Sequence, residues 1–114
     1  EFNDFRRHDL SKAFLGVSPG EFNIFLSHSP DLFQQAQDYG SNLYLCGHTH
    51  HGQIQLPKIG PILTFSSAPR RFTKGAWHYK TMAGYTGPGL GTVAASVRFR
   101  CPPKAVVLTL CNSS

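Results

Sequence analysis

The segment spanning residues 21–46 constrains the fold more than any other part of the chain. Residues 21–26 are rich in β-forming side chains, which predicts a short buried strand, and residues 42–46 predict a second strand. Roughly 14 residues separate the strands, the length of a right-handed helical crossover, so they are expected to run parallel. The carboxyl ends of both strands should therefore meet at one edge of a sheet.

Sequence signals also mark the ends of the expected helices. Ser29 is expected to cap the crossover helix, with Pro30 in its first turn and Asp31 facing its positive end. Gly40 is expected to end that helix. A shorter helix is expected earlier in the chain, with Asp9 as its cap.

Beyond residue 51 the pattern changes to short segments joined by turns. Alternation predicts half-exposed strands over residues 76–82 and 96–100, and residues 104–110 predict a terminal, largely buried strand. Residues 84–91 contain four glycines, which predicts a loop. The expected class is α/β (α+β), with a βαβ unit followed by mostly antiparallel strands.

Composition narrows the class of protein. Hydrophobic residues make up 40% of the 114 residues and charged residues 15%, which excludes a disordered chain and fits one domain. The net charge of +5 would attract phosphate-bearing partners, but the scattered basic residues argue against a specific nucleic-acid surface. Three cysteines form no disulfide framework and suit a reducing compartment. No apolar run approaches the ~20 residues of a membrane helix.

Three histidines carry the chemical signal. His28 directly follows the first expected strand and His48 the second, so their side chains should start about 5–10 Å apart. His48 and His50 point the same way if the segment is extended. Because neutral imidazole is the commonest metal ligand in proteins, the sequence predicts that His28, His48 and His50 bind metal.

Other interpretations of these residues remain open. Cys46, His48 and His50 alternate and could form a mixed sulfur and nitrogen zinc site in a small non-catalytic module. His51 adjoins the cluster and could contact a bound phosphate. His8 and His78 lack such context and are expected to be surface or packing residues. A basic nucleic-acid binder has no supporting motif.

The histidine motifs carry a family resemblance. Ser-His-Ser-Pro-Asp at 27–31 and Gly-His-Thr-His at 47–50 resemble the C-terminal half of the calcineurin-like metallophosphoesterases. Residues 52–57, 89–92 and 97–103 are similar to a bacterial branch of membrane-associated phosphodiesterases, which includes a UDP-2,3-diacylglucosamine pyrophosphatase. The resemblance extends over nearly the whole chain and implies a sandwich of two mixed sheets flanked by helices.

The resemblance also implies a site and a reaction. His28 and His48 would bind the second of two divalent metal ions (Mn, Fe, Zn or Ni), and His50 the first. Arg98 would lie near the site and hold phosphate oxygens, while His51, where the branch has Gly, would narrow the substrate pocket or add a weak metal ligand. The implied activity is phosphoester hydrolysis, on a phosphorylated small molecule or a lipid-linked phosphodiester. No catalytic side chain is identified, and no specific nucleic acid is implied.

The family's N-terminal motifs, Asp-x-His, Gly-Asp-x-x-Asp and Gly-Asn-His-Glu, do not occur in these 114 residues. We therefore expect residues 1–114 to form the C-terminal portion of the family domain, to hold an incomplete site and to show little activity alone. Half of a two-sheet sandwich would expose an apolar sheet face, which predicts self-association. The expected location is cytoplasmic or peripheral to the membrane, with membrane association of the full-length protein.

Overall fold

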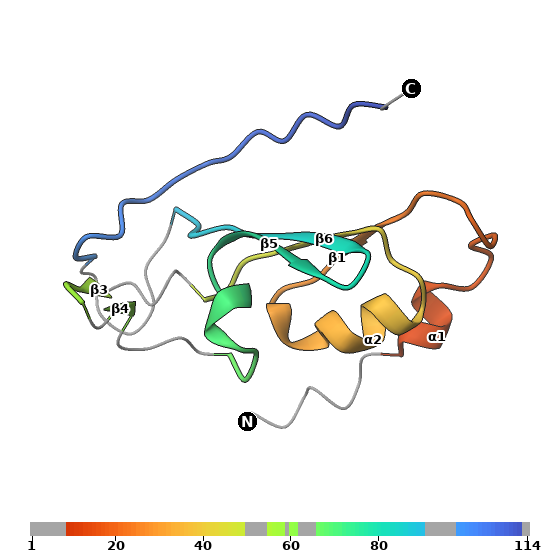
Figure 1. The fold of residues 1–114 in the computed structure, drawn as a ribbon, viewed down its shortest axis with the longest axis horizontal. Coiled ribbons are helices and arrows are strands. Elements are labelled where there is room, and N and C mark those ends of the chain that lie inside the picture. The colour runs from red at the N-terminus through yellow and green to blue at the C-terminus, as the bar shows by residue number, and fades with distance from the viewer. Residues whose placement is uncertain (1–8, 50–54, 59, 62–65, 91–97, 113–114) are drawn as a thin grey trace.

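The computed structural model describes residues 9–49, 55–58, 60–61, 66–90 and 98–112. These form a mixed α/β fold with a four-stranded sheet, a two-stranded sheet and short helices, in agreement with the expected class (Figure 1). In chain order the elements are α1 (Leu10–Ala13), β1 (Ile24–Leu26), η2 (Pro30–Leu32), α2 (Phe33–Asp38), β2 (Leu43–Cys46), β3 (Gln55–Leu56), β4 (Gly60–Pro61), η4 (Arg70–Phe72), β5 (Gly75–Tyr79) and β6 (Met82–Thr86).

The larger sheet has the strand order β1-β2-β6-β5. β1 and β2 are parallel neighbours, which confirms the strand–helix–strand prediction, and β6 is parallel to β2 on its other side. β5 pairs antiparallel with β6 as a hairpin. Three strands therefore end at the same edge of the sheet, and this edge carries the candidate site.

One face of this sheet is covered. Alternate residues turn inward from each strand, including the buried Tyr44, Trp77 and Met82, and pack against Phe33 of α2 and Phe72 of η4. The rings of Tyr44 and Trp77 lie 5.6 Å apart and those of Phe33 and Phe72 lie 4.5 Å apart. Figure 1 shows α2 against this side of the sheet. The core is therefore a single aromatic layer between the sheet and the helices.

The strand predicted over residues 76–82 is wrong in its extent. β5 ends at Tyr79, the chain turns at Lys80 with φ of 52°, and β6 follows immediately. The loop predicted from residue 84 is also wrong for residues 84–86, which are the end of β6. Gly84 lies under the Trp77 ring, where a Cβ atom would come within 2.3 Å of ring carbons. The glycine that suggested a loop is instead required by packing within the sheet.

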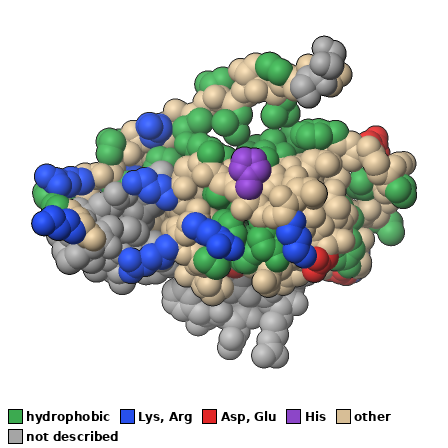
Figure 2. Space-filling model, viewed as in Figure 1, with side chains coloured by type: hydrophobic (Ala, Val, Ile, Leu, Met, Phe, Trp, Pro, Cys, Tyr) green, Lys and Arg blue, Asp and Glu red, His purple; other side chains and the backbone are tan. Residues whose placement is uncertain are grey.

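The buried terminal strand predicted over residues 104–110 is also wrong. Among the described residues this segment is assigned to no strand, and the side chain of Val107 is 92% exposed. Figure 1 shows it running past the sheet on the side opposite α2, and Figure 2 shows hydrophobic side chains beside it at the surface. Apolar composition alone predicted burial, whereas burial needs a partner layer that these residues do not find. The strand expected over 96–100 lies partly outside the described residues.

The crossover differs from expectation in detail. Its first turn is the 3-10 helix η2, and the Ser29 hydroxyl makes no capping hydrogen bond. The Asp31 carboxylate accepts hydrogen bonds from the Ser66 hydroxyl at 2.9 Å and from the backbone N–H groups of Ser67 at 2.7 Å and Ala68 at 3.1 Å. Asp31 therefore ties the crossover to a distant loop, a role that no local rule could predict.

The first strand is exposed, which corrects the prediction of a buried one. β1 has three residues, and Leu26 is 72% exposed. β1 is the edge strand, and its outward side chains lie on the sheet face away from α2. Hydrophobic composition predicted burial of both faces, but the helices that the structure describes cover only the face that carries Tyr44 and Trp77.

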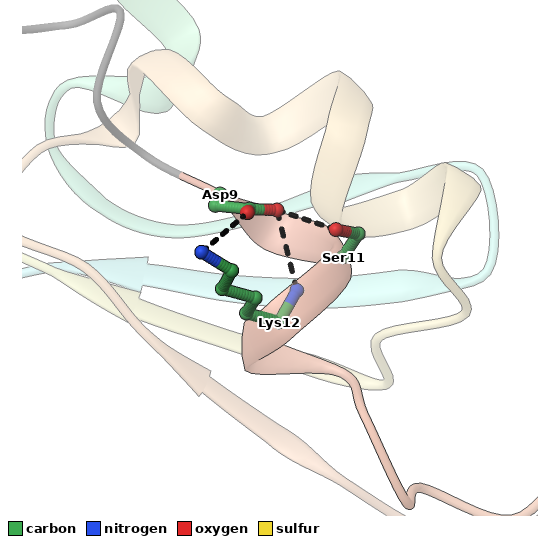
Figure 3. Close-up of polar contacts among 3 residues, drawn as sticks. All are labelled: Asp9, Ser11 and Lys12. Atoms are coloured by element: carbon green, nitrogen blue, oxygen red, sulfur yellow. Dashed lines mark hydrogen bonds and ion pairs between the residues drawn. The ribbon is translucent and has the colours of Figure 1, made fainter.

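The short first helix follows its predicted start. The Asp9 carboxylate accepts a hydrogen bond from the backbone N–H of Lys12 and also contacts the Lys12 ammonium group at 3.4 Å and the Ser11 hydroxyl (Figure 3). Just after the helix, the ring of Phe14 stacks on that of Phe25 at 5.6 Å. This contact joins α1 to the inner face of β1. No helix within the described residues is long and apolar enough to cross a bilayer.

Candidate metal centre

The sheet brings His28 and His48 together. Parallel pairing continues one step past β1 and β2, because the N–H of Ser27 donates to the Leu45 carbonyl at 3.0 Å and that of Gly47 to the His28 carbonyl at 3.2 Å. The two imidazole rings lie 4.3 Å apart between centroids, with their planes at 47°. The adjacency expected from the strand ends is therefore present.

His48 occupies an unusual backbone conformation. Its φ is 65°, and the N–H of Thr49 donates across it to the Gly47 carbonyl at 2.7 Å. A hydrogen bond between residues i and i+2 around a positive φ is the pattern of the rare, strained type of γ-turn. A side chain in this region costs on the order of 1–2 kcal/mol. Such strain occurs preferentially at functional sites, where it aims a side chain.

Two buried hydrogen bonds hold the histidine loops from below. The Tyr44 hydroxyl donates to the Ser29 carbonyl at 2.7 Å, and the Thr49 hydroxyl donates to the Thr73 carbonyl at 2.7 Å. Burial raises the pKa of Tyr44, so its hydroxyl remains protonated as the donor that this bond needs. Sequence reasoning assigned no role to Tyr44 or Thr49, because each acts through a backbone group distant in sequence.

The ring pair lies close to the spacing that one metal ion requires. Two imidazoles that bind one ion at about 2.1 Å, with an angle of about 90–110° at the ion, place their ring centres roughly 4.6–5.3 Å apart. The 4.3 Å separation of the His28 and His48 rings is slightly shorter, so the rings would move apart by a few tenths of an ångström to admit an ion. No group of three or more potential ligands occurs among the residues that the structure describes, and His50 and His51 lie outside them. The described residues thus offer two ligands.

Comparison with known proteins identifies the family. No family model matches the chain, and no solved structure does. An uncharacterised metallophosphoesterase of Bacillus subtilis, YkuE, is 42% identical over 90% of this chain and 35% of its own length. The phosphodiesterase YaeI of Escherichia coli is 32% identical over 76% of this chain and 32% of its own. The chain belongs to the metallophosphoesterases.

This metallophosphoesterase chain spans about a third of the length of YkuE and of YaeI. A third relative, the UDP-2,3-diacylglucosamine pyrophosphatase LpxG of Chlamydia trachomatis, is 40% identical over 46% of the chain and 16% of its own length. At family level these relatives support phosphoester hydrolysis that depends on divalent metal ions. The paired imidazoles suit such ions.

Cys46 is placed differently from a metallophosphoesterase ligand. Its sulfur lies 3.2 Å from the Thr86 hydroxyl on the covered side of the sheet. Burial raises the pKa of the Cys46 thiol to about 11. The alternative zinc site of Cys46, His48 and His50 remains a prediction, since His50 lies outside the described residues.

Arg98 has backbone partners. Its Nε donates to the Cys101 carbonyl at 2.6 Å and its Nη2 to the Pro88 carbonyl at 3.0 Å. The Arg98 guanidinium thus joins Pro88, which closely follows β6, to Cys101 in the C-terminal segment. The contact of Arg98 with substrate phosphate that the resemblance implied remains a prediction, as does that of His51.

Proposed function

We propose that this chain supplies His28, His48 and His50 to the two-metal site of a phosphodiesterase or pyrophosphatase. The observation that carries the proposal is the 4.3 Å approach of the His28 and His48 rings at one sheet edge. In the proposed site, His28 and His48 hold the second metal ion and His50 holds the first. The names of YaeI and LpxG favour phosphodiester and pyrophosphate substrates respectively.

The chain's own residues serve to position ligands. Divalent ions, when bound, polarise the phosphoryl group and lower the pKa of water. The hydroxyls of Tyr44 and Thr49 hold the backbone next to His28 and His48 respectively. The two imidazoles are therefore oriented before an ion binds. Such supporting contacts typically change metal affinity about 10–100-fold.

The site proposed here also needs carboxylate ligands, and the family motifs that carry them do not occur in these 114 residues. Three imidazoles bind one ion, whereas a pair of ions held about 3.5–4 Å apart requires bridging groups. The isolated chain is therefore expected to bind a single divalent ion (Mn, Fe, Zn or Ni) and to hydrolyse phosphoesters slowly or not at all. Its substrate class is a phosphorylated small molecule or a lipid-linked phosphodiester.

Calorimetric titration with Mn²⁺ and Zn²⁺ tests the metal site. Binding at one ion per chain is expected for the natural sequence, with at least a tenfold loss in His28→Ala and in His48→Ala. His78→Ala is the matched control, since His78 is exposed on β5. A site lost in Cys46→Ala but kept in His28→Ala would establish the alternative module instead.

Hydrolysis of bis-p-nitrophenyl phosphate tests completeness separately. We expect the isolated chain with Mn²⁺ to show no turnover above its His48→Ala variant. Robust turnover that disappears in His48→Ala would support the metal site while contradicting its incompleteness.

A further inference from the structure

Charges are segregated along this chain. All six Asp and Glu residues lie at or before Asp38, whereas eight of the eleven Lys and Arg residues follow it. Figure 2 shows Lys and Arg side chains across the left and centre of this face, whereas the clearly visible Asp and Glu side chains lie toward the right. On this face the basic side chains therefore outnumber the acidic ones at the end away from α1.

Three basic residues line one pocket. Lys74, Arg100 and Lys104 surround a volume of about 260 Å³ together with Tyr85, and none of the acidic residues that the structure describes lines it. Lys74 directly precedes β5, while Arg100 and Lys104 lie in the C-terminal segment, residues 98–112.

The walls of the pocket are fixed by hydrogen bonds. The backbone N–H of Lys104 donates to the Gly89 carbonyl at 3.1 Å. Arg98 joins Pro88 to Cys101, and both of these residues line the pocket. The segment carrying Arg100 and Lys104 is thus attached to the end of β6 before any ligand binds, which lowers the cost of binding.

We propose that this pocket binds a phosphate group. Three cations match the oxygens of a phosphate, and an Arg guanidinium can hold two of these oxygens at once. The volume is below the roughly 300–1,000 Å³ of sites for drug-sized ligands, so it suits one phosphate group rather than an entire ligand. A soluble ester or a lipid headgroup supplies this phosphate, and two arms of one experiment separate these sources.

The pocket is distinct from the histidine pair but lies along the same sheet edge. Pro88 follows β6 much as His48 follows β2, and these strands are parallel neighbours about 5 Å apart. The N–H of Gly87 donates to the Cys46 carbonyl at 2.9 Å, which keeps the two chain segments together beyond the strands. Neither His28 nor His48 lines the pocket.

Titration with sodium pyrophosphate, followed by NMR in the presence of EDTA, tests the proposal without metal. The amide resonances of Gly75, Tyr85 and Lys104 should shift saturably, and sodium chloride at equal ionic strength should not reproduce the shifts. Vesicles of phosphatidylglycerol and of phosphatidylcholine form the second arm. Shifts with phosphatidylglycerol vesicles but not with pyrophosphate would assign the phosphate to a lipid headgroup.

The variant Arg100→Gln/Lys104→Gln should weaken binding at least about tenfold, since charged hydrogen bonds are lost. Lys12→Gln/Lys80→Gln removes the same charge outside the pocket and should retain the natural affinity. His48→Ala should bind the phosphate probe with the natural affinity. A failure of phosphate binding is therefore distinguishable from a failure of the proposed metal site. The proposal is overturned if neither probe shifts these amides, or if both double variants weaken binding equally.

Discussion

The imidazole rings of His28 and His48 lie 4.3 Å apart although twenty residues separate them in the chain. Each ring follows the carboxyl end of a parallel strand, and the backbone bond from Gly47 to the His28 carbonyl sets their register. This relationship makes the proposed metal site testable through backbone strain, supporting hydrogen bonds and packing beneath the sheet.

The strained backbone at His48 predicts a difference between two substitutions that both remove the ligand. His48→Gly should be more stable than His48→Ala by about 1 kcal/mol, because glycine adopts a φ of 65° without steric cost. Urea unfolding measures the difference. As a control, Lys80→Gly should gain similarly over Lys80→Ala without changing metal affinity, since Lys80 has φ of 52° in the β5–β6 turn. Equal stability of the two His48 variants would show that the strain is absent.

The Tyr44 hydroxyl is predicted to support His28. Tyr44→Phe keeps the ring but leaves the buried Ser29 carbonyl without its donor, which should cost about 1–3 kcal/mol. Zn²⁺ affinity should fall about tenfold, since the loop carrying His28 loses an anchor. Tyr79→Phe, which removes a hydroxyl from β5, should preserve that affinity. Unchanged Zn²⁺ binding in Tyr44→Phe would restrict Tyr44 to a role in stability.

Gly84 is predicted to be intolerant of any side chain. A Cβ atom there would lie 2.3 Å from Trp77 ring carbons, and the ring is held by a 2.9 Å bond from its Nε1 to the Thr86 hydroxyl. Gly84→Ala should therefore destabilise the fold by about 1–3 kcal/mol or more. In Gly87→Ala the new Cβ would meet its nearest neighbour at 3.9 Å, so thermal unfolding should change little. Equal melting temperatures for the two variants would contradict this account of the core.

The lowered pKa of Asp31 predicts that the fold loses stability in acid. Partial burial raises its pKa, but hydrogen bonds involving Ser29, Ser67 and Ser66 outweigh this effect and hold the pKa below its ordinary value of 3.8. A lowered pKa stabilises the fold at pH above 3.8, and this contribution is lost as pH falls through the folded-state value. Asp31→Asn should be less stable than the natural chain near neutral pH, and the difference should shrink in acid. A pH-independent difference in unfolding free energy would rule out this linkage.

The open face of the sheet predicts self-association of the 114-residue chain. Ile24 and Leu26 on the edge strand are 43% and 72% exposed, and exposed apolar patches drive association. Light scattering should show dimers or larger species. Leu26→Glu should shift the population toward monomer, whereas Lys12→Glu, a charge change on α1, should not. A monomeric natural chain at high concentration would refute the prediction.

Local sequence rules were sufficient where local interactions decide the structure. The length of the crossover between residues 26 and 42 fixed the parallel pairing of β1 and β2, and hence the adjacency of His28 and His48. Asp9 caps its helix as expected because the cap uses residues within one turn. The family resemblance of the histidine motifs was likewise contained in the sequence, and the relatives confirm it.

Tertiary structure alone decided which apolar segments are buried and which polar groups are paired. Leu26 and Val107 look like core residues in sequence but remain exposed, since only one face of the sheet is covered by helices. Asp31, Tyr44 and Thr49 bond to groups between 15 and 37 residues away, so no window of sequence could assign their partners. Local sequence thus identified the proposed ligands, whereas the contacts that would orient them depend on packing between distant segments.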